Sequence, residues 1–508
     1  MKKKWLGLAA TAALTLGLAA CSSSQSSTKE DDKLEVVASF YPIYEFTKNI
    51  VGEEGNVELL IGAGTEVHGF EPSTKDMTKI QNADAFVYDD ENMETWVPDI
   101  QEAIDSDKVN FVKATGDMLL MAGTEEEGHD HNHGEEGHHH EFDPHVWLSP
   151  TRAITMVENI RDNLSEAYPD KAETFKTNAD AYIKKLEELD KEYSSALSTA
   201  QQKSFVTQHA AFGYLALDYG LTQVPITGIS ADTEPTAQRL TELVKYVKEY
   251  EIKYIYFEEN ASSTVAKTLA DEAGVKTAVL NPLESLTNDQ MKAGEDYFSV
   301  MRSNLEALQL TTNVAGKAIQ PEEDTTKTVA NGYFEDANIK DRTLSDWTGE
   351  WQSVYPYLLD GTLDQVWDYK AKKSNGSMTA AEYKDYYTTG YKTDVEAINI
   401  DGDKNTIEFV QNGKSHKFTY EYVGYKVLTY KKGNRGVRFL FTTQDENAGE
   451  FKNIQFSDHG IAPQTAEHFH LFWGAEDHEV LFEEMENWPT YYPADLTGHE
   501  IAQEIVAH

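Results

Sequence analysis

Cysteine is nearly absent from this sequence, which has one thiol, Cys21, in 508 residues. A single thiol cannot form an internal disulfide, and it excludes a structural zinc site built from several thiolates. Any metal site must therefore use histidine, carboxylate or backbone oxygen ligands. Basic residues are scarce too, because 44 lysines and arginines stand against 87 acidic residues, for a formal net charge of −43. So acidic a chain repels nucleic acid, and no nucleic-acid partner is expected.

Long apolar runs are absent beyond the first residues of the chain. Three lysines at 2–4 precede an apolar stretch at 5–20, which ends directly before Cys21. The stretch is short for a membrane-spanning helix, which needs about 20 apolar residues. A basic segment, an apolar core and small residues before a cleavage point are typical of a secretory signal. Residues 18–21 resemble a bacterial lipobox. The resemblance implies that 1–20 are removed and that Cys21 carries a lipid at the extracellular face of the membrane, with 21–33 as tether.

The composition is that of a folded chain with several domains. Apolar residues make up 40% of the sequence and aromatic residues 11%. At ~100–200 residues per domain, the length corresponds to about two to four domains. From residue 34 to 115, apolar runs alternate with helical patterns, which indicates a parallel sheet covered by helices. Strands are expected at 34–40, 57–61, 85–88 and 110–113, and helices at 42–50 and 74–81.

A long helix is expected over about 150–196. Apolar residues recur there at spacings of 4, 3, 4, 3 and 4, which forms one face of an α-helix. We therefore expect one domain at 34–314, with lobes at about 34–145 and 200–314 joined by this helix. Such pairs of lobes bind ligands in the cleft between them. In the second lobe, strands are expected at 204–208, 223–226, 253–257 and 276–280, and a helix at 289–308.

Residues 125–141 interrupt this pattern with the sequence EEEGHDHNHGEEGHHHE. Low complexity combined with many imidazole and carboxylate side chains is typical of a loop that binds metal ions weakly. Two hypotheses remain open for this histidine-rich segment. It could capture zinc and hand it over, or it could be an insertion whose metal affinity is incidental.

A change in composition marks a second domain. Residues 315–330 are polar and lack aromatic residues, which is typical of an interdomain linker. From 331 to 508, aromatic residues are frequent, and turn pairs such as Asp401-Gly402 and Asn412-Gly413 separate β-type runs. This pattern favours antiparallel strands joined by hairpins, and we expect a barrel. The fold class expected is an α/β two-lobed domain with a long connecting helix, followed by a mainly-β barrel domain.

Four potential metal ligands lie in loops of the first domain: His68, His145, His209 and Glu284. Ligands of open α/β sheets bind at the carboxyl ends of strands, and three of the four follow an expected strand. Two come from each half of the domain, so they can meet only between the lobes. Three imidazoles and one carboxylate suit tetrahedral Zn²⁺. Four protein ligands leave no position for an activated water, so such a site would hold a metal rather than use it in catalysis.

The segments around these residues read HGFEP, DPHVWLSP, QHAAFGY and NPLE. On these motifs, residues 34 to about 312 resemble the metal-binding receptors of cluster A-I of the ABC-transporter solute-binding proteins. The resemblance implies a rigid helix between two lobes, small closure movements on metal binding, and an ABC permease as partner. It implies Zn²⁺ or Mn²⁺ as the metal, and the histidine-rich segment resembles that of the zinc-specific branch. The ligands that it implies are His68, His145, His209 and Glu284.

A second group of histidines lies near the end of the chain. His468 and His470 are two residues apart on a β-type run, and side chains two apart on a strand point to the same face. With His459 from a nearby loop, they form a set of three imidazoles that suits Zn²⁺. A solvent-facing alternation would explain polar residues at 468 and 470, but not histidine at both.

Three segments of the second domain are distinctive: GYFEDANIKDRTLSDWTGEWQSVYPYL, FSDHGIAPQTAEHFHLFWG and ENWPTYYPADLT. On these segments, residues 331–508 resemble the ZinT family of zinc-binding, lipocalin-like bacterial proteins. The resemblance implies a small lipocalin-like (calycin) barrel that binds Zn²⁺ through His459, His468 and His470.

Together the two resemblances imply an extracellular lipoprotein that binds one Zn²⁺ per domain and delivers zinc to the permease of an ABC importer. It is expected to act as a monomer and not as an enzyme. A manganese-binding receptor and a metal-dependent adhesin remain alternatives. A zinc hydrolase is less favoured, because no H-E-x-x-H, G-x-S-x-G or P-loop pattern occurs in the sequence.

Overall fold

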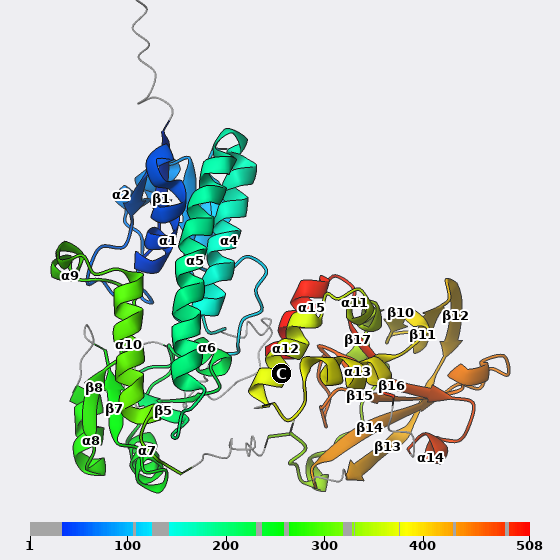
Figure 1. Cartoon of the computed structure of the whole chain (residues 1–508). Coiled ribbons are helices and arrows are strands. Elements are labelled where there is room, and N and C mark those ends of the chain that lie inside the picture. The colour runs from blue at the N-terminus through cyan, green and yellow to red at the C-terminus, as the bar shows by residue number, and fades with distance from the viewer. Residues whose placement is uncertain are drawn as a thin grey trace, which may run out of the picture.

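The computed structural model describes residues 33–104, 108–123, 142–229, 236–258, 264–317, 328–329, 331–374, 376–429, 433–482 and 487–507. The expected signal segment, Cys21, the histidine-rich segment and residues 318–327 of the expected linker lie outside these ranges. An α/β body and a β-rich body lie side by side (Figure 1). Within the described ranges, no helix combines the length and the apolar character of a membrane span.

The first lobe is a parallel sheet of four strands in the order β2-β1-β3-β4. All four residues of β3 are buried, as is usual where helices cover both faces of a parallel sheet. Helix α2 begins at a capping box, in which Ser73 and Asp76 bond each other's backbone N–H groups. The elements are β1 (Leu34–Ala38), α1 (Tyr41–Val51), β2 (Gly55–Leu59), α2 (Thr74–Gln81), β3 (Ala85–Tyr88), α3 (Val97–Ala103) and β4 (Asn110–Lys113).

The second lobe repeats this strand order, with a parallel sheet β6-β5-β7-β8. The helix expected at 289–308 is divided, because Gly294 adopts a left-handed conformation with φ of 83° and ends the first piece. The elements are β5 (Ser204–Thr207), α6 (Gly213–Asp218), β6 (Thr222–Pro225), α7 (Ala237–Glu249), β7 (Tyr254–Phe257), α8 (Thr264–Ala273), β8 (Lys276–Val279), α9 (Asn288–Ala293) and α10 (Tyr297–Thr312).

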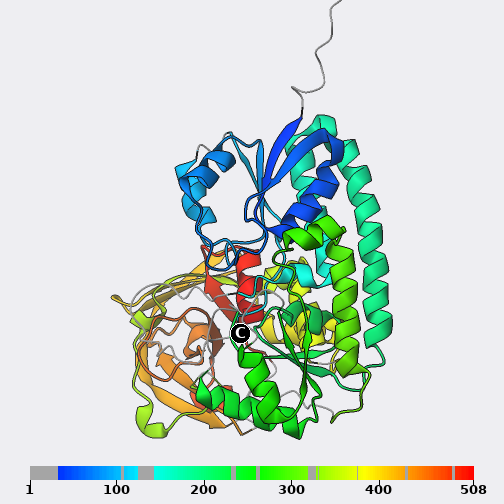
Figure 2. The ribbon, with the colours of Figure 1, turned by 90° about the vertical axis from the view of Figure 1, so that its left-hand side faces the viewer.

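The helix expected at 150–196 is two helices in the structure, α4 (Pro150–Ala167) and α5 (Ala172–Leu197). Proline disfavours the helical conformation of the residue before it, and Tyr168, which precedes Pro169, has a ψ of 70°. The 26 residues of α5 correspond to about 39 Å of helix. Figure 2 shows α5 running along both lobes. Its buried residues include the predicted apolar face, and α5 packs against α1 of the first lobe and α10 of the second, so it connects the two lobes.

The second domain is a nine-stranded antiparallel sheet that curls into a half-barrel, in the order β12-β11-β10-β9-β17-β16-β15-β14-β13. Asn412 and Gly413, with φ of 50° and 70°, form the tight turn between β11 and β12. The strands are β9 (Gly349–Ser353), β10 (Val395–Asp401), β11 (Thr406–Gln411), β12 (Lys414–Thr419), β13 (Glu421–Thr429), β14 (Arg435–Thr442), β15 (Asn453–Ser457), β16 (Phe469–Gly474) and β17 (Thr490–Pro493). The helices are α11 (Tyr355–Leu359), α12 (Asp364–Lys373), α13 (Ala380–Tyr391), α14 (His478–Leu481) and α15 (Gly498–Ala507).

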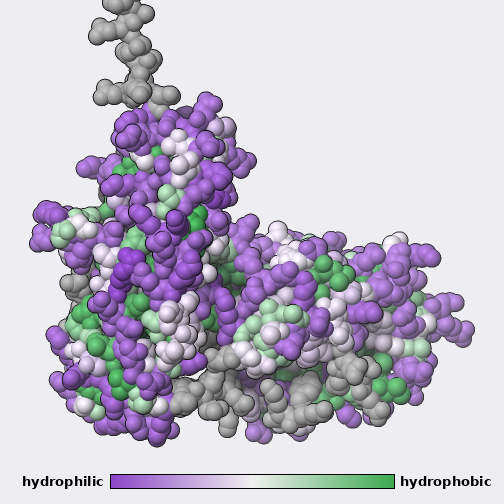
Figure 3. All heavy atoms as spheres, viewed as in Figure 1, coloured by the Kyte–Doolittle hydropathy of each residue, from purple (hydrophilic) through white to green (hydrophobic). Residues whose placement is uncertain are grey.

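The two bodies touch through α12 and α15 of the second domain. Gln503 of α15 holds the backbone of Leu120 with two hydrogen bonds of 2.7 and 2.8 Å. Lys372 of α12 lies 2.8 Å from the carboxylate of Asp218, at the end of α6. Leu119 is buried in the apolar cluster formed by α11, α12 and α15. The outer surface is mainly hydrophilic in the face that Figure 3 shows, in keeping with the net charge of −43.

Candidate metal centres

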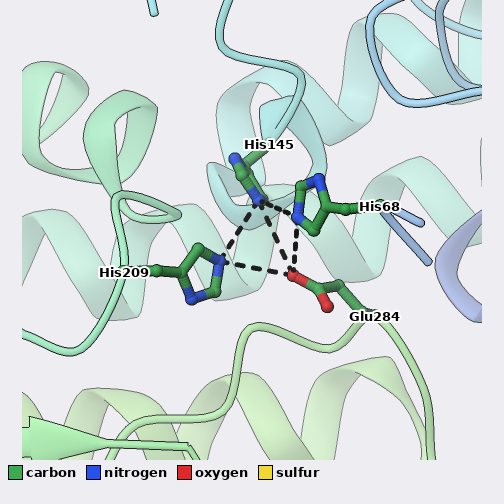
Figure 4. A group of neighbouring side chains, drawn as sticks. All are labelled: His68, His145, His209 and Glu284. Carbon is green, nitrogen blue, oxygen red and sulfur yellow. Dashed lines mark hydrogen bonds and ion pairs between the residues drawn. The ribbon is translucent and has the colours of Figure 1, made fainter. Parts of the chain in front are cut away.

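The structure brings His68, His145, His209 and Glu284 together where the two lobes meet (Figure 4). We call this group the interlobe centre. His68 lies in the loop between β2 and α2, and His145 lies just before the helical turn that leads into α4. His209 follows β5, and Glu284 follows β8. Each lobe therefore supplies two of these side chains, and three of the four follow a strand, as the sequence predicts.

The spacing of the four ligand atoms fits a tetrahedral zinc ion. The Nε2 atom of His145 lies 3.2 Å from Nε2 of His68 and 3.3 Å from Nε2 of His209. Oε1 of Glu284 lies 3.4–3.6 Å from the Nε2 atoms of all three histidines. Metal–ligand distances of ~2.0–2.2 Å in a tetrahedron place the ligand atoms about 3.3–3.6 Å apart. Oε1 is buried and makes no well-formed hydrogen bond among the described residues, so it faces the place where a cation would lie.

Two further carboxylates orient the histidines. Nδ1 of His145 donates to Oδ1 of Asp143 at 2.7 Å, and Nδ1 of His209 donates to Oε1 of Glu258 over a short contact. A proton on Nδ1 leaves the lone pair of Nε2 for a metal, and carboxylate partners of this kind commonly fix the tautomer of metal-binding histidines. Both imidazole rings are fully buried. Their orientation is therefore set before any metal arrives.

The same carboxylates favour protonation of the histidines in the metal-free centre. Burial disfavours a charged His145, but the Asp143 and Glu284 carboxylates outweigh burial and raise the pKa of His145. For His209, burial again opposes the charge, while Glu258 and Glu284 raise the pKa to about 10. Burial alone would raise the pKa of Glu284, but the three histidines around it hold that pKa well below its usual range. Zinc must therefore displace protons here.

Trp147 fixes the distance between two of the ligand loops. Its indole Nε1 donates to the carbonyl of Pro282 at 2.8 Å, and the hydroxyl of Tyr297 donates to the carbonyl of Trp147 at 2.6 Å. The Trp147 side chain is fully buried. Because His145 lies two residues before Trp147 and Glu284 two residues after Pro282, these bonds hold both ligands in place.

The structure also brings His459, His468 and His470 together, and we call them the C-terminal centre. Each offers a ring nitrogen within 4.8 Å of the others. The ring centroids are 5.4–5.9 Å apart. The ring of His468 also stacks on Tyr492 at 5.2 Å. Three imidazoles with a free fourth position can hold Zn²⁺ together with a water or a further ligand.

Thr490 orients one of these rings. The hydroxyl of Thr490 donates to the carbonyl of Trp488 at 2.9 Å, so its oxygen accepts a hydrogen bond from Nδ1–H of His470 at 2.8 Å. Burial and the neighbouring His459, His468 and Arg438 side chains hold the pKa of His470 well below its usual value. His470 is therefore neutral and presents the lone pair of Nε2.

Both domains match family models. Residues 36–310 match the model described as zinc-uptake complex component A periplasmic (ZnuA), and residues 325–508 match ZinT (YodA) periplasmic lipocalin-like zinc-recruitment. The chain is 65% identical over 509 residues, 100% of both chains, to the zinc-binding lipoprotein AdcA of Streptococcus pneumoniae strain R6. It is 66% identical over 490 residues to the zinc-binding protein AdcA of Streptococcus pyogenes serotype M3, covering 94% of this chain and 95% of the relative.

The chain belongs to the AdcA family of zinc-binding proteins. The crystal structure of Zn(II)-bound AdcA from Streptococcus pneumoniae matches it with a TM-score of 0.83 at 64% identity, and covers 94% of this chain and 100% of that chain. These findings confirm both family resemblances and the predicted fold class. The AdcA family consists of zinc-binding receptors rather than enzymes, in agreement with the prediction that this chain is not an enzyme.

The sequence analysis did not assign Asp143 and Glu258 as partners of the ligands. Asp143 stands in the DPHVWLSP motif, two residues before His145, so its place in the motif was a usable signal. Glu258 follows β7, the neighbour of β5 in the sheet, and its role depends on a strand pairing that local sequence does not reveal. The histidine-rich segment lies outside the described residues, and both hypotheses for it stay predictions.

Proposed function

We propose that this AdcA-family chain is a lipid-anchored extracellular receptor that binds one Zn²⁺ at the interlobe centre and one at the C-terminal centre. The ion held between the lobes is delivered to the permease of an ABC importer. We further propose His68, His145, His209 and Glu284 as the ligands of the first ion. His459, His468 and His470 are the proposed ligands of the second. The folding units proposed are 34–314 and 331–508, joined by 315–330.

The tetrahedral spacing at the interlobe centre carries this proposal. Four ligand atoms lie 3.2–3.6 Å from one another along the edges measured, which leaves room for one ion and no water. A closed site of this kind holds its cargo without chemistry. The ligands come from both lobes, so a relative movement of the lobes would open the site and release the ion. That property suits a carrier that must give up its metal to a partner.

Zinc uptake by cells tests the delivery step. A bacterium that lacks its own copy of the chain would be complemented with wild type, His145→Ala or His416→Gln, and uptake of radioactive zinc would be measured at limiting zinc. His416 lies on β12 and belongs to neither centre, so it serves as the matched control. We expect wild type and the control to restore uptake and His145→Ala to fail. Equal uptake with and without the chain contradicts a role as receptor.

The lipid anchor at Cys21 and the monomeric state are separate proposals. Mass spectrometry of the membrane fraction should show a mature chain that begins at a diacylated Cys21, and Cys21→Ala should release the protein into the medium. Light scattering of the form that lacks residues 1–21 should give the mass of one chain. A Cys21→Ala protein that stays with the membrane, or a dimer mass, would contradict these two proposals respectively.

A further inference from the structure

A buried arginine near the start of the second domain makes contacts that zinc ligation alone does not explain. The side chain of Arg342 is fully inaccessible to solvent. Its Nε donates to Asp346 at 2.6 Å, one terminal nitrogen donates to Asp458 at 2.7 Å, and the other donates to the carbonyl of Gln464 at 3.0 Å. The guanidinium also lies 4.1 Å from the ring of Trp347. Each of the three nitrogens of this planar cation donates a hydrogen bond, a geometry that a lysine could not reproduce.

Two of these contacts reach the loop that carries a proposed zinc ligand. Asp458 directly precedes His459, and Oδ1 of Asp458 accepts from Arg342 and also from the backbone N–H of Gly460 at 3.2 Å. The carboxylate of Asp458 therefore bridges the residues on both sides of His459. Between them, His459 has a φ of 62°, in the left-handed region that non-glycine residues rarely adopt. A conformation of this kind persists only when the surrounding contacts enforce it.

The rest of the loop is fastened to the same short segment of chain. The backbone N–H of Lys340 donates to the carbonyl of Ile461 at 2.9 Å. Asp346 accepts from the N–H of Gln464 through its carboxylate at 3.3 Å, and from the N–H of Ala466 through its carbonyl at 2.9 Å. Residues 340–346 thus form a template along 458–466. This loop begins next to His459 and ends two residues before His468.

We propose that Arg342 is a positioning residue for the C-terminal centre. It holds Asp458, and through Asp458 it keeps His459 in the left-handed conformation from which its ring meets those of His468 and His470, at centroid distances of 5.7 and 5.4 Å. Arg342 acts only through this loop and is not itself a ligand. The inference rests on the proposed function of the C-terminal centre as a zinc site.

A purely stabilising role explains the arrangement less well. Burying an ion pair removes two charges from water, and this cost often cancels the attraction between them, so a buried pair is weak evidence for stability. Geometric specificity is the better-supported use of such a pair. Residues that orient a metal ligand typically contribute about 10–100-fold to metal affinity. We therefore expect the loss of Arg342 to be seen in zinc affinity at one centre, more than in unfolding.

The test compares zinc affinities of full-length mature protein by competition with a chromogenic chelator. The C-terminal centre is measured alone in a His68→Ala background, and the interlobe centre alone in a His468→Ala background. Arg342→Lys keeps the charge and loses the planar fork. Arg435→Lys is the matched control, because Arg435 bonds an aspartate, Asp336, and a backbone carbonyl and lies over an aromatic ring, but makes these contacts away from the loop.

Arg342→Lys should lower the zinc affinity of the C-terminal centre about 10–100-fold and leave that of the interlobe centre unchanged. Arg435→Lys should change neither affinity. Asp458→Asn, which keeps the shape of the loop, should give the same selective loss. If Arg342→Lys lowers the thermal midpoint of unfolding by more than Arg435→Lys does, the zinc affinity of Asp458→Asn is the deciding measurement. Unchanged affinity in both variants, or an equal loss at both centres, overturns the role of Arg342. Absence of zinc binding by the His68→Ala parent contradicts instead the proposed function of the C-terminal centre.

Discussion

The two candidate centres place histidine in opposite electrostatic settings. At the interlobe centre, three imidazoles share a buried site with the Glu284 carboxylate, and Asp143 and Glu258 stand behind two of the rings. At the C-terminal centre, the group consists of three imidazoles, and a hydroxyl rather than a carboxylate orients His470. The pKa of His209 is raised to about 10 in the first centre, whereas the pKa of His470 is lowered in the second.

The two centres therefore offer the same ion two kinds of site, one with a carboxylate among its ligand groups and one with imidazoles. A closed site with surplus negative charge favours the dication strongly, but it also binds protons that zinc must displace. A neutral site with a free fourth position binds with less help from charge, and it can exchange ligands there. The first arrangement suits holding zinc until delivery, and the second suits capture.

The largest effect is expected from removal of a ligand at the interlobe centre. His145→Ala deletes the ring whose Nε2 lies 3.2–3.6 Å from the other three ligand atoms. Zinc affinity there should fall by more than the about 100-fold that loss of an outer partner can cost. Competition titration in a His468→Ala background measures this, with His416→Gln as control. Retention of tight binding would show that these four residues do not form the zinc site.

The second-largest effect is expected from pH, because zinc affinity should depend on pH more steeply at the interlobe centre than at the C-terminal centre. Because the pKa of His209 is about 10, the metal-free ring carries a second proton at any pH below that value. Zinc must displace this proton, so zinc affinity at the interlobe centre falls as the pH falls. One displaced proton gives about tenfold per pH unit, or about 100-fold between pH 8 and 6. Because the pKa of His470 is lowered, its ring is neutral in this range, and zinc displaces no extra proton from Nε2. Titrations at several pH values, on the two single-centre proteins, should therefore show a steep and a shallow dependence. Equal slopes would contradict the electrostatic contrast.

Removal of the Glu258 carboxylate, which accepts from His209, should lower zinc affinity less than removal of a ligand does. Glu258→Gln keeps the shape and removes the charge that accepts from Nδ1, and affinity at the interlobe centre should fall about 10–100-fold. The slope of affinity against pH should also become shallower, because the pKa of His209 drops. Glu192→Gln, at an exposed ion pair with Arg302, is the control. If Glu258→Gln behaves like this control, Glu258 does not tune the centre.

The smallest effect tests whether the centres are independent. Lys372→Met removes the ion pair with Asp218, which joins the two domains and is partly exposed on the lysine side. Asp218 keeps its bonds to Arg152 and Ser149, so the free energy of unfolding should fall by less than about 1 kcal/mol. Both zinc affinities should stay within about twofold of wild type. A larger change at either centre would show that the two centres are coupled through the interface and are not independent.

The residues of the two candidate centres could be named from the sequence because they stand in specific motifs. Helix α2 was predicted with its correct bounds, since its capping residues Ser73 and Asp76 are local. Local patterns failed where the cause was a single proline, at Pro169 between α4 and α5. The mainly-β prediction for the second domain also named none of its helices, among them α12 and α13, whose aromatic residues are common in strands.

The partners of the ligands could not be predicted, because they depend on contacts between distant parts of the chain. Glu258 reaches His209 across 49 residues, and Arg342 reaches Asp458 across 116. Each lies in a segment whose local pattern shows a strand end or a turn and no ligand. Only the packing of β7 beside β5, and of the segment 340–346 along the loop 458–466, brings them into place.

Anomalous diffraction at the zinc absorption edge, on crystals of the mature full chain grown with zinc, would locate the bound ions. We expect two peaks per chain. One should lie among Oε1 of Glu284 and the Nε2 atoms of His68, His145 and His209, and the other among the rings of His459, His468 and His470. A single peak, or a peak away from these residues, would contradict the assignment of two zinc centres of different character.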